Sequence, residues 1–204
     1  MIRRILALAV AAALPAAALA ATTTWNIDPA HSGSHFAVKH LVISTVRGDF
    51  GKTTGTIMLD EKDFAKSSVE ATIDVTTIDT KVADRDTHLK SPDFFDAANN
   101  PTMTFKSKKV ERAGADKLKV TGDLTIKGKT KPVVLSATYS KPVKGMGGET
   151  RRAFAATTKI NRKDFGLAWS KTVEAGPVVG DMVDVTIDIE AVKDEPKAAA
   201  AEKQ

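Results

Sequence analysis

The fold class is decided by the stretch Val183-Asp184-Val185-Thr186-Ile187-Asp188-Ile189-Glu190. Its β-branched aliphatic residues alternate strictly with polar residues, which is the period of a β-strand that buries one face. We expect the aliphatic side chains to face an interior and the polar side chains to face water. A strand of this kind is typical of antiparallel sheets, in which one face packs on a core and the other is solvated.

Shorter versions of the same alternation recur along the chain. They predict further strands at residues 25–28, 34–41, 46–52, 54–59, 69–75, 102–110, 117–127, 133–139 and 154–160. Gly128 lies between two of them and predicts a hairpin turn that needs a positive φ. Many short alternating strands indicate a sandwich or an up-and-down barrel, and a closed barrel leaves no edge strand exposed. We therefore predict an all-β fold, an antiparallel barrel of about eight strands.

Residues 84–105 interrupt this pattern with charged residues, a histidine and two adjacent phenylalanines. Residues 84–89 favour a short helix. Ser91 and Pro92 suit the N-cap and first position of a second short turn over residues 93–98, and Asn99-Asn100-Pro101 ends it. We expect a short helical cap segment around residues 84–98 that covers one end of the barrel.

The N-terminus has the features of a secretory signal peptide. Arg3 and Arg4 precede an apolar run over residues 5–14, and Ala18-Leu19-Ala20 fits the small-residue cleavage pattern. The apolar run is too short for a stable transmembrane helix. We expect residues 1–20 to be cleaved, a barrel domain over residues 21–192, and a disordered tail rich in alanine and charge over residues 193–204. A periplasmic or secreted location follows from the signal peptide.

Composition excludes several functional classes. The 204 residues carry a formal net charge of +5, with the lysines spread along the chain, so the charge does not predict nucleic-acid binding. The chain has no cysteine, which removes disulfides, thiol catalysis and thiolate metal sites. No Gly-x-Ser-x-Gly, His-Glu-x-x-His, P-loop or Rossmann glycine motif occurs. We predict a protein that is not an enzyme and uses no cofactor.

Two groups of polar residues are open to a functional interpretation. His31, His35 and His40 fall in one short window, but residues four apart on a strand lie about 13 Å from each other, so we predict no metal site. Arg85 and His88 either donate hydrogen bonds to a ligand head group or brace the cap. In the bracing alternative Arg85 pairs with Asp93 or Asp96, and His88 caps a backbone carbonyl.

Several motifs together resemble the YceI-like, polyisoprenoid-binding proteins. The motifs are Trp25-Asn26-Ile27-Asp28-Pro29-Ala30-His31-Ser32, Phe36-Ala37-Val38-Lys39-His40-Leu41, Arg85-Asp86-Thr87-His88-Leu89-Lys90-Ser91-Pro92-Asp93-Phe94-Phe95-Asp96, Pro101-Thr102-Met103-Thr104-Phe105, Gly122-Asp123-Leu124-Thr125-Ile126-Lys127-Gly128-Lys129-Thr130, Arg162-Lys163-Asp164-Phe165-Gly166 and Val179-Gly180-Asp181. Each motif alone is weak evidence for the family, but together and in this order the motifs span residues 24–192. The resemblance implies an extended lipocalin-like barrel with no general catalytic activity, and members of the family hold a polyisoprenoid, an isoprenoid quinone or a fatty-acyl amide inside it.

The alternation alone leaves open whether the interior is a filled core or a cavity, and the resemblance favours a cavity for a long-chain isoprenoid or acyl lipid. The expected lumen and gate residues are Phe36, Val38, Ile73, Val75, Phe94, Phe95, Phe105, Leu124, Ile126, Phe154, Phe165, Trp169, Val183, Val185 and Ile187. Within this group Phe94, Phe95, Phe165 and Trp169 are candidates for a gate or a plug. Transient membrane contact and pairing into a homodimer stay open. The alternatives are an enzyme that uses His88 with Asp86 or Asp93, and a metal- or protein-binding module with a filled barrel.

Overall fold

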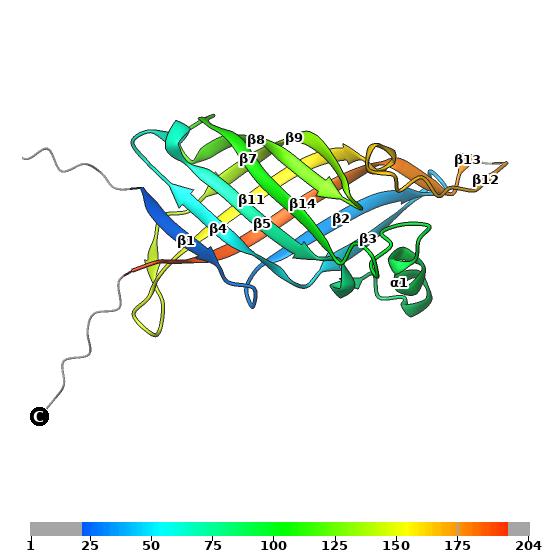
Figure 1. Ribbon diagram of the computed structural model, residues 1–204, viewed down its shortest axis with the longest axis horizontal. Coiled ribbons are helices and arrows are strands. Elements are labelled where there is room, and N and C mark those ends of the chain that lie inside the picture. The colour runs from blue at the N-terminus through cyan, green and yellow to red at the C-terminus, as the bar shows by residue number, and fades with distance from the viewer. Residues whose placement is uncertain (1–21, 175, 196–204) are drawn as a thin grey trace, which may run out of the picture.

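The alternating stretches of the sequence form the wall of a closed antiparallel barrel. The computed structural model describes residues 22–174 and 176–195, and the barrel is elongated with a short helix beside one end (Figure 1). The ring has eight strands, as the sequence predicts. They are β1 (Thr23–Ile27), β4 (Thr53–Leu59), β5 (Ser68–Asp74), β7 (Thr102–Arg112), β8 (Lys117–Ile126), β9 (Lys129–Tyr139), β11 (Thr150–Asn161) and β14 (Val179–Lys193).

Strand β14, which contains the stretch that decides the fold class, closes the ring. One edge of β14 pairs with β11 from Asn161↔Met182 to Arg151↔Val192. The other edge pairs first with β2 (Gly33–His40) and then with β1. β2 continues into β3 (Ser44–Phe50), which pairs with the short strand β6 (Ile78–Asp79). These three strands lengthen the barrel wall toward the end that carries the helix.

The helix α1 (Ala83–Lys90) confirms the first half of the predicted cap. Over residues 93–98, where a second short turn is expected, the chain folds back in successive turns and forms no second helix. The Ser91 carbonyl accepts hydrogen bonds from the amides of Phe94, at 3.1 Å, and Asp96, at 2.9 Å. Asp96 then takes a left-handed conformation with φ of 50°. This tight path buries both Phe94 and Ala97.

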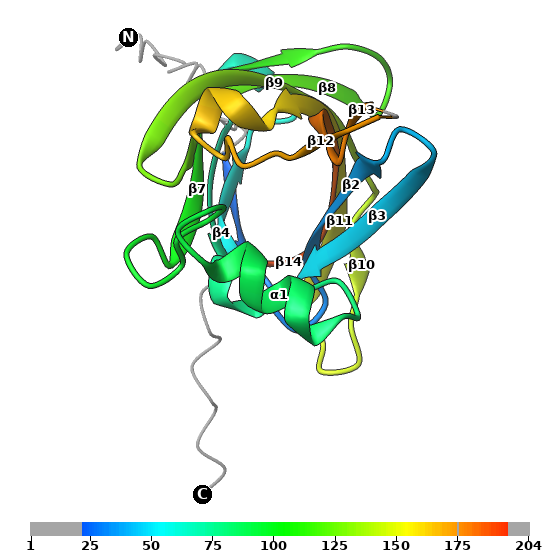
Figure 2. The same cartoon turned by 90° about the vertical axis from the view of Figure 1, so that its right-hand side faces the viewer.

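The remaining elements lie at the two ends of the barrel. They are the 3₁₀ turns η1 (Phe64–Lys66), η2 (Val75–Thr77) and η3 (Arg162–Phe165), and the short strands β10 (Val143–Lys144), β12 (Thr172–Val173) and β13 (Gly176–Pro177). Helix α1, β12 and β13 lie at the end opposite to the chain termini, and we call it the cap end (Figure 1). Figure 2 looks into the barrel from this end, with α1 at the rim. None of the helices described is long and apolar enough to cross a membrane.

Strand β14 continues to Lys193, the first residue of the expected tail. Lys193 pairs with Trp25, and the Asp194 amide donates to the Thr24 carbonyl at 2.8 Å. The predicted signal peptide and residues 196–204 of the predicted tail lie outside the described residues.

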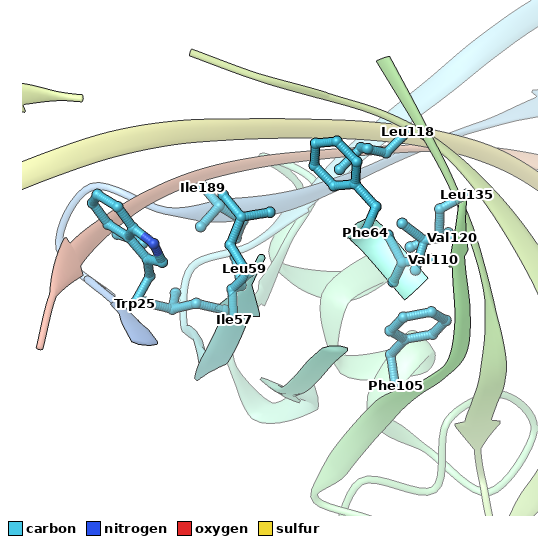
Figure 3. Close-up of a cluster of buried hydrophobic side chains, with 12 residues drawn as sticks. Trp25, Ile57, Leu59, Phe64, Phe105, Val110, Leu118, Val120, Leu135 and Ile189 are labelled. Carbon is cyan, nitrogen blue, oxygen red and sulfur yellow. The ribbon is translucent and has the colours of Figure 1, made fainter. Parts of the chain in front are cut away.

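Buried side chains form two clusters along the barrel axis. The cluster nearer the termini contains Trp25, Leu59, Phe64, Phe105 and Ile189 among its members (Figure 3). The cluster at the cap end contains Phe50, Val75, Ile78, Phe165 and Leu167 among others. The space between and around these clusters forms the candidate site.

Candidate functional site

The inward side chains leave an elongated cavity inside the barrel. Its volume is about 220 Å³, and its surface is almost entirely apolar. Every strand of the ring contributes, with Ile27, Ile57, Ile73, Phe105, Leu124, Leu135, Phe154 and Ile187 as one representative each. A β-strand points alternate side chains to opposite faces, so the period of two in the sequence produces this apolar wall directly.

Most of the predicted lumen residues line this cavity. They are Phe36, Val38, Ile73, Phe94, Phe95, Phe105, Leu124, Ile126, Phe154, Phe165, Val183, Val185 and Ile187. The parity assigned to β14 is therefore correct, since Val183, Val185 and Ile187 face inward while Asp184, Thr186 and Asp188 are exposed. The sequence did not indicate the inward position of Val110, because the register of β7 shifts between Ser107 and Lys109.

Two predicted lumen residues lie elsewhere. Val75 is 1% exposed but does not line the cavity, because β5 ends at Asp74 and Val75 enters the turn η2. Its amide donates to the Pro101 carbonyl at 2.9 Å, which removes it from the alternation of the strand. Trp169, a gate or plug candidate, follows η3 and packs on Phe94 at the cap end, with ring centroids 5.3 Å apart, and does not line the cavity.

The end of the barrel near the termini is closed by packed aromatic rings around a buried arginine. Arg152 is 3% exposed and lies 5.1 Å from the Trp25 ring and 5.4 Å from the Tyr139 ring. Its guanidinium donates to Glu61 at 2.8 Å. Trp25 meets Phe154 edge to face at 6.4 Å, and Phe64 packs on Tyr139. These side chains close that end of the barrel.

Aromatic side chains also cover the cap end, but in two separate groups. The inner group joins Phe36, Phe50 and Phe95, with ring centroids 5.7 and 5.6 Å apart. The outer group joins Phe94 to His88 and Trp169, with centroids 5.0 and 5.3 Å away. The inner rings belong to the wall and lumen, whereas the outer group attaches the cap to the segment that follows η3.

The charged residues of the cap brace it, with partners other than those expected. Arg85 does not pair with Asp93 or Asp96; its Nε donates to the Thr80 hydroxyl and its Nη2 to the Thr80 carbonyl, each at 2.7 Å. His88 does not cap a backbone carbonyl, and its Nε2 lies 2.9 Å from Oδ2 of Asp93. Asp86 accepts hydrogen bonds from Thr80 instead of reaching His88. Neither Arg85 nor His88 lines the cavity.

Arg162 is the polar residue of the lumen wall whose role sequence reasoning missed. Its side chain is 4% exposed, and its guanidinium donates to the carbonyls of Leu167, Trp169, Val179 and Gly180. It therefore ties the segment after η3 to the start of β14. Burial lowers the pKa of the guanidinium. Its place in the Arg-Lys-Asp-Phe-Gly motif was the available signal, because a buried arginine needs several acceptors.

One other polar pair is built into the apolar wall. The hydroxyls of Ser34 and Thr53 are 3.1 Å apart, and the two residues are 3% and 1% exposed. Each hydroxyl provides the hydrogen-bond partner that the other cannot obtain from water.

The three clustered histidines do not converge on one point. His31 bonds Asp28 at 2.9 Å, His35 bonds Asp49 at 2.6 Å, and His40 lies at the far end of β2. Ligand atoms of Asp28, His31 and Glu190 approach within 4.8 Å of one another. However, the Arg151 guanidinium donates to both carboxylates, at 2.8 and 2.5 Å, so a cation already occupies this cluster.

Comparison with known proteins agrees with the barrel and its motifs. The model of the YceI-like domain family matches residues 25–191. A UPF0312 protein of Vibrio parahaemolyticus is 39% identical over 188 residues, which cover 91% of this chain and 95% of the relative.

Two solved structures share the fold. The structure of BcnA from Burkholderia cenocepacia is similar with a TM-score of 0.71 and 27% identity, over 80% of this chain and 98% of that one. A polyisoprenoid binding domain from Saccharophagus degradans, described as implicated in plant cell wall breakdown, has a TM-score of 0.60 and 15% identity, over 82% of this chain and 97% of that one.

Proposed function

Because the chain belongs to the YceI-like domain family, we propose that it is a binding protein that holds one long-chain amphiphile in the lumen of its barrel. The observation that carries this proposal is the apolar cavity of about 220 Å³ inside the ring of strands. A soluble domain gains stability by filling its interior, so a lumen left open and lined by aliphatic and aromatic side chains is best explained by a ligand.

The shape of the lumen favours a slender chain over a bulky ligand. Pockets for drug-sized molecules usually have volumes of roughly 300–1,000 Å³, and the cavity volume of about 220 Å³ is smaller than this range. Each buried methylene group contributes about 0.8 kcal/mol, so a chain of several isoprene units or a fatty-acyl chain gains affinity with length. A polyisoprenoid, an isoprenoid quinone or an acyl amide has this form, and a polyisoprenoid binding domain shares the fold.

The polar head group belongs at the cap end in this proposal. The lumen surface is almost free of polar atoms, and the other end is blocked by Trp25 and Arg152. A head group inside the lumen would lose its hydrogen bonds to water without replacement, which is unfavourable. Phe94, Phe95 and Phe165 would then be the side chains that move when a chain enters. The ligand is cargo, and the protein needs no cofactor.

We propose that the protein is exported and carries, stores or sequesters its lipid in the periplasm or outside the cell. The support is the sequence of residues 1–20, with two arginines before an apolar run and a small-residue cleavage pattern. Binding, and not catalysis, is proposed because His88 and Asp93 form a dyad on the cap and neither residue lines the cavity.

The test is to purify the protein from its own cells, record its native mass spectrum and extract it with organic solvent. We expect one molecule of a long-chain amphiphile per chain, released on unfolding. His88→Ala should retain this lipid without chemical change. A protein that carries no lipid and does not take up decylubiquinone or a fatty-acyl amide in solution would contradict the proposal.

A further inference from the structure

Aliphatic side chains are exposed to solvent at the cap end of the barrel. In the turn between β2 and β3, Val42 is 59% exposed and Ile43 is 82% exposed. Val173 of the neighbouring strand β12 is 44% exposed. We call Val42, Ile43 and Val173 the apolar tip. Both hairpins project at the same end of the barrel, beyond the ring and away from the termini (Figures 1 and 2).

The backbone holds this turn in a conformation that aliphatic residues rarely adopt. Leu41 and Val42 have φ of 51° and 66°, where hairpins normally place glycine or asparagine. The Leu41 amide donates to the Val178 carbonyl at 3.0 Å, and the Val178 amide donates to the Lys171 carbonyl at 2.9 Å. These hydrogen bonds fix the two hairpins against each other. The aliphatic side chains are therefore kept outward, although polar turn residues would fit the backbone better.

Basic residues surround the apolar tip. Lys39 and Arg47 lie on β2 and β3 below the turn, and Lys171 directly precedes β12. All three are exposed, and none forms an ion pair within residues 22–174 and 176–195. Glu174 is the acidic residue of this corner. An apolar projection with a basic surround matches a lipid surface that carries negative charge.

The apolar tip is continuous with the lumen. Val38 and Val179 line the cavity, and Val179 pairs with His40, the residue before Leu41. The wall of the lumen therefore leads directly to the base of the turn. The exposed apolar area is a convex projection of a few side chains, whereas a stable protein interface needs about 800 Å² from each partner. A bilayer accepts such a projection because lipids rearrange around it.

We propose that the apolar tip inserts into an anionic bilayer surface and so positions the cap end of the barrel for lipid exchange with the membrane. The exchange rests on the proposed function, whereas the docking does not and can be measured without ligand. The three side chains enter the interface between head groups and acyl chains, and Lys39, Arg47 and Lys171 meet the phosphates.

The experiment is co-sedimentation of the purified protein with vesicles of phosphatidylcholine and phosphatidylglycerol. We expect wild-type protein to bind, and Val42→Ser with Ile43→Ser to weaken binding at least about tenfold. The matched control is Val134→Ser with Val143→Ser, which removes two valines that are 45% and 62% exposed elsewhere on the surface. This control should bind like wild type. Lys39→Gln with Lys171→Gln should weaken binding about tenfold to anionic vesicles and have little effect on pure phosphatidylcholine vesicles.

Ligand binding is measured separately, with decylubiquinone added from ethanol. The tip variant, Val42→Ser with Ile43→Ser, should bind decylubiquinone with wild-type affinity. Only its rate of quinone uptake from vesicles should fall. The docking proposal is overturned if the wild-type protein does not bind vesicles, or if the tip variant binds them as well as wild type does. It is also overturned if the control variant loses as much vesicle binding as the tip variant, or if the protein forms a stable dimer in which the apolar tip is buried. If the wild-type protein does not bind decylubiquinone, this result would instead contradict the proposed function.

Discussion

The paired hydroxyls of Ser34 and Thr53 make opposite predictions for single and double substitution. Ser34→Ala leaves the Thr53 hydroxyl buried without a partner, because the two oxygens are 3.1 Å apart and Thr53 is 1% exposed. We expect a loss of about 1–3 kcal/mol in the free energy of unfolding. Ser34→Ala with Thr53→Val removes both polar groups and should cost less than the single change. Urea denaturation measures both, and a double variant as unstable as the sum of the two singles would contradict the coupling.

The cluster around Arg151 predicts acid sensitivity. The hydrogen bonds from His31 and then Arg151 lower the pKa of Asp28 from 3.8 to about 2. The folded state therefore binds the Asp28 proton less tightly than the unfolded state. This contribution to stability is complete above pH 4 and is lost as the pH falls toward 2. In Asp28→Asn, the unfolding free energy should be lower than in wild type at pH 5 and should depend less steeply on pH between 4 and 2.

The control for this prediction is Asp116→Asn, which changes an exposed carboxylate without a side-chain partner among the described residues. Denaturation curves between pH 2 and 5 should show the wild-type slope for this variant. Equal slopes for Asp28→Asn and wild type would mean that the cluster does not couple folding to protonation.

At the scale of elements, Arg162 attaches the segment after η3 to β14. Arg162→Met keeps the aliphatic stem but leaves the carbonyls of Leu167, Trp169, Val179 and Gly180 without their donor. We expect a loss of more than about 3 kcal/mol in unfolding free energy, since each buried acceptor without a partner costs about 1–3 kcal/mol. Lys163→Met is the matched control; Lys163 pairs with Asp181 at 2.8 Å on the surface, and its loss should cost less than about 1 kcal/mol.

The same elements explain what the sequence predicts well and what it does not. Strands with an unbroken period of two, such as Val183–Ile189, were predicted with the right inward face because the pleat alone sets that face. Val75 was misplaced because a hydrogen bond to Pro101, distant in sequence, ends β5 one residue earlier. The packing of Trp169 on Phe94 was not predictable, because Trp169 lies in an irregular segment without periodicity. The partners of Arg85 and Arg162 depend on how loops meet at the barrel ends, and no local pattern encodes that.

For the whole molecule, closure of the barrel depends on pairings between segments that are far apart in sequence. The alternating stretches predicted a closed antiparallel barrel of about eight strands, and the ring has eight. The order of partners along one edge of β14, with β2 first and β1 after it, was not predictable from the sequence. The register of a strand depends on all of its neighbouring strands and not on its own residues alone. That order of partners extends the barrel wall between the end packed around Trp25 and the end covered by the cap. The lumen therefore has an inner half near Trp25 and an outer half near the cap, and the use of the inner half by a bound chain can be tested.

Ala156 lies on β11 between Phe154, near the closed end, and Ile160, nearer the cap, and it faces the lumen. Ala156→Trp should block the deeper half of the lumen and keep the fold, because the new side chain enters an open cavity instead of a filled core. In wild type, affinity for primary alcohols should rise with chain length by about 0.8 kcal/mol per methylene group. In Ala156→Trp this rise should stop at a shorter chain, while short alcohols still bind.

The matched control is Thr157→Trp, which adds the same ring to the exposed neighbour on the outer face of the same strand. It should keep the wild-type dependence on chain length when the alcohols displace a fluorescent alkyl probe. An unchanged dependence in Ala156→Trp would mean that chains bind outside the lumen. A cut-off that appears only in Ala156→Trp would locate the bound chain in the lumen of the barrel, because the same ring on the outer face of β11 leaves the lumen unchanged.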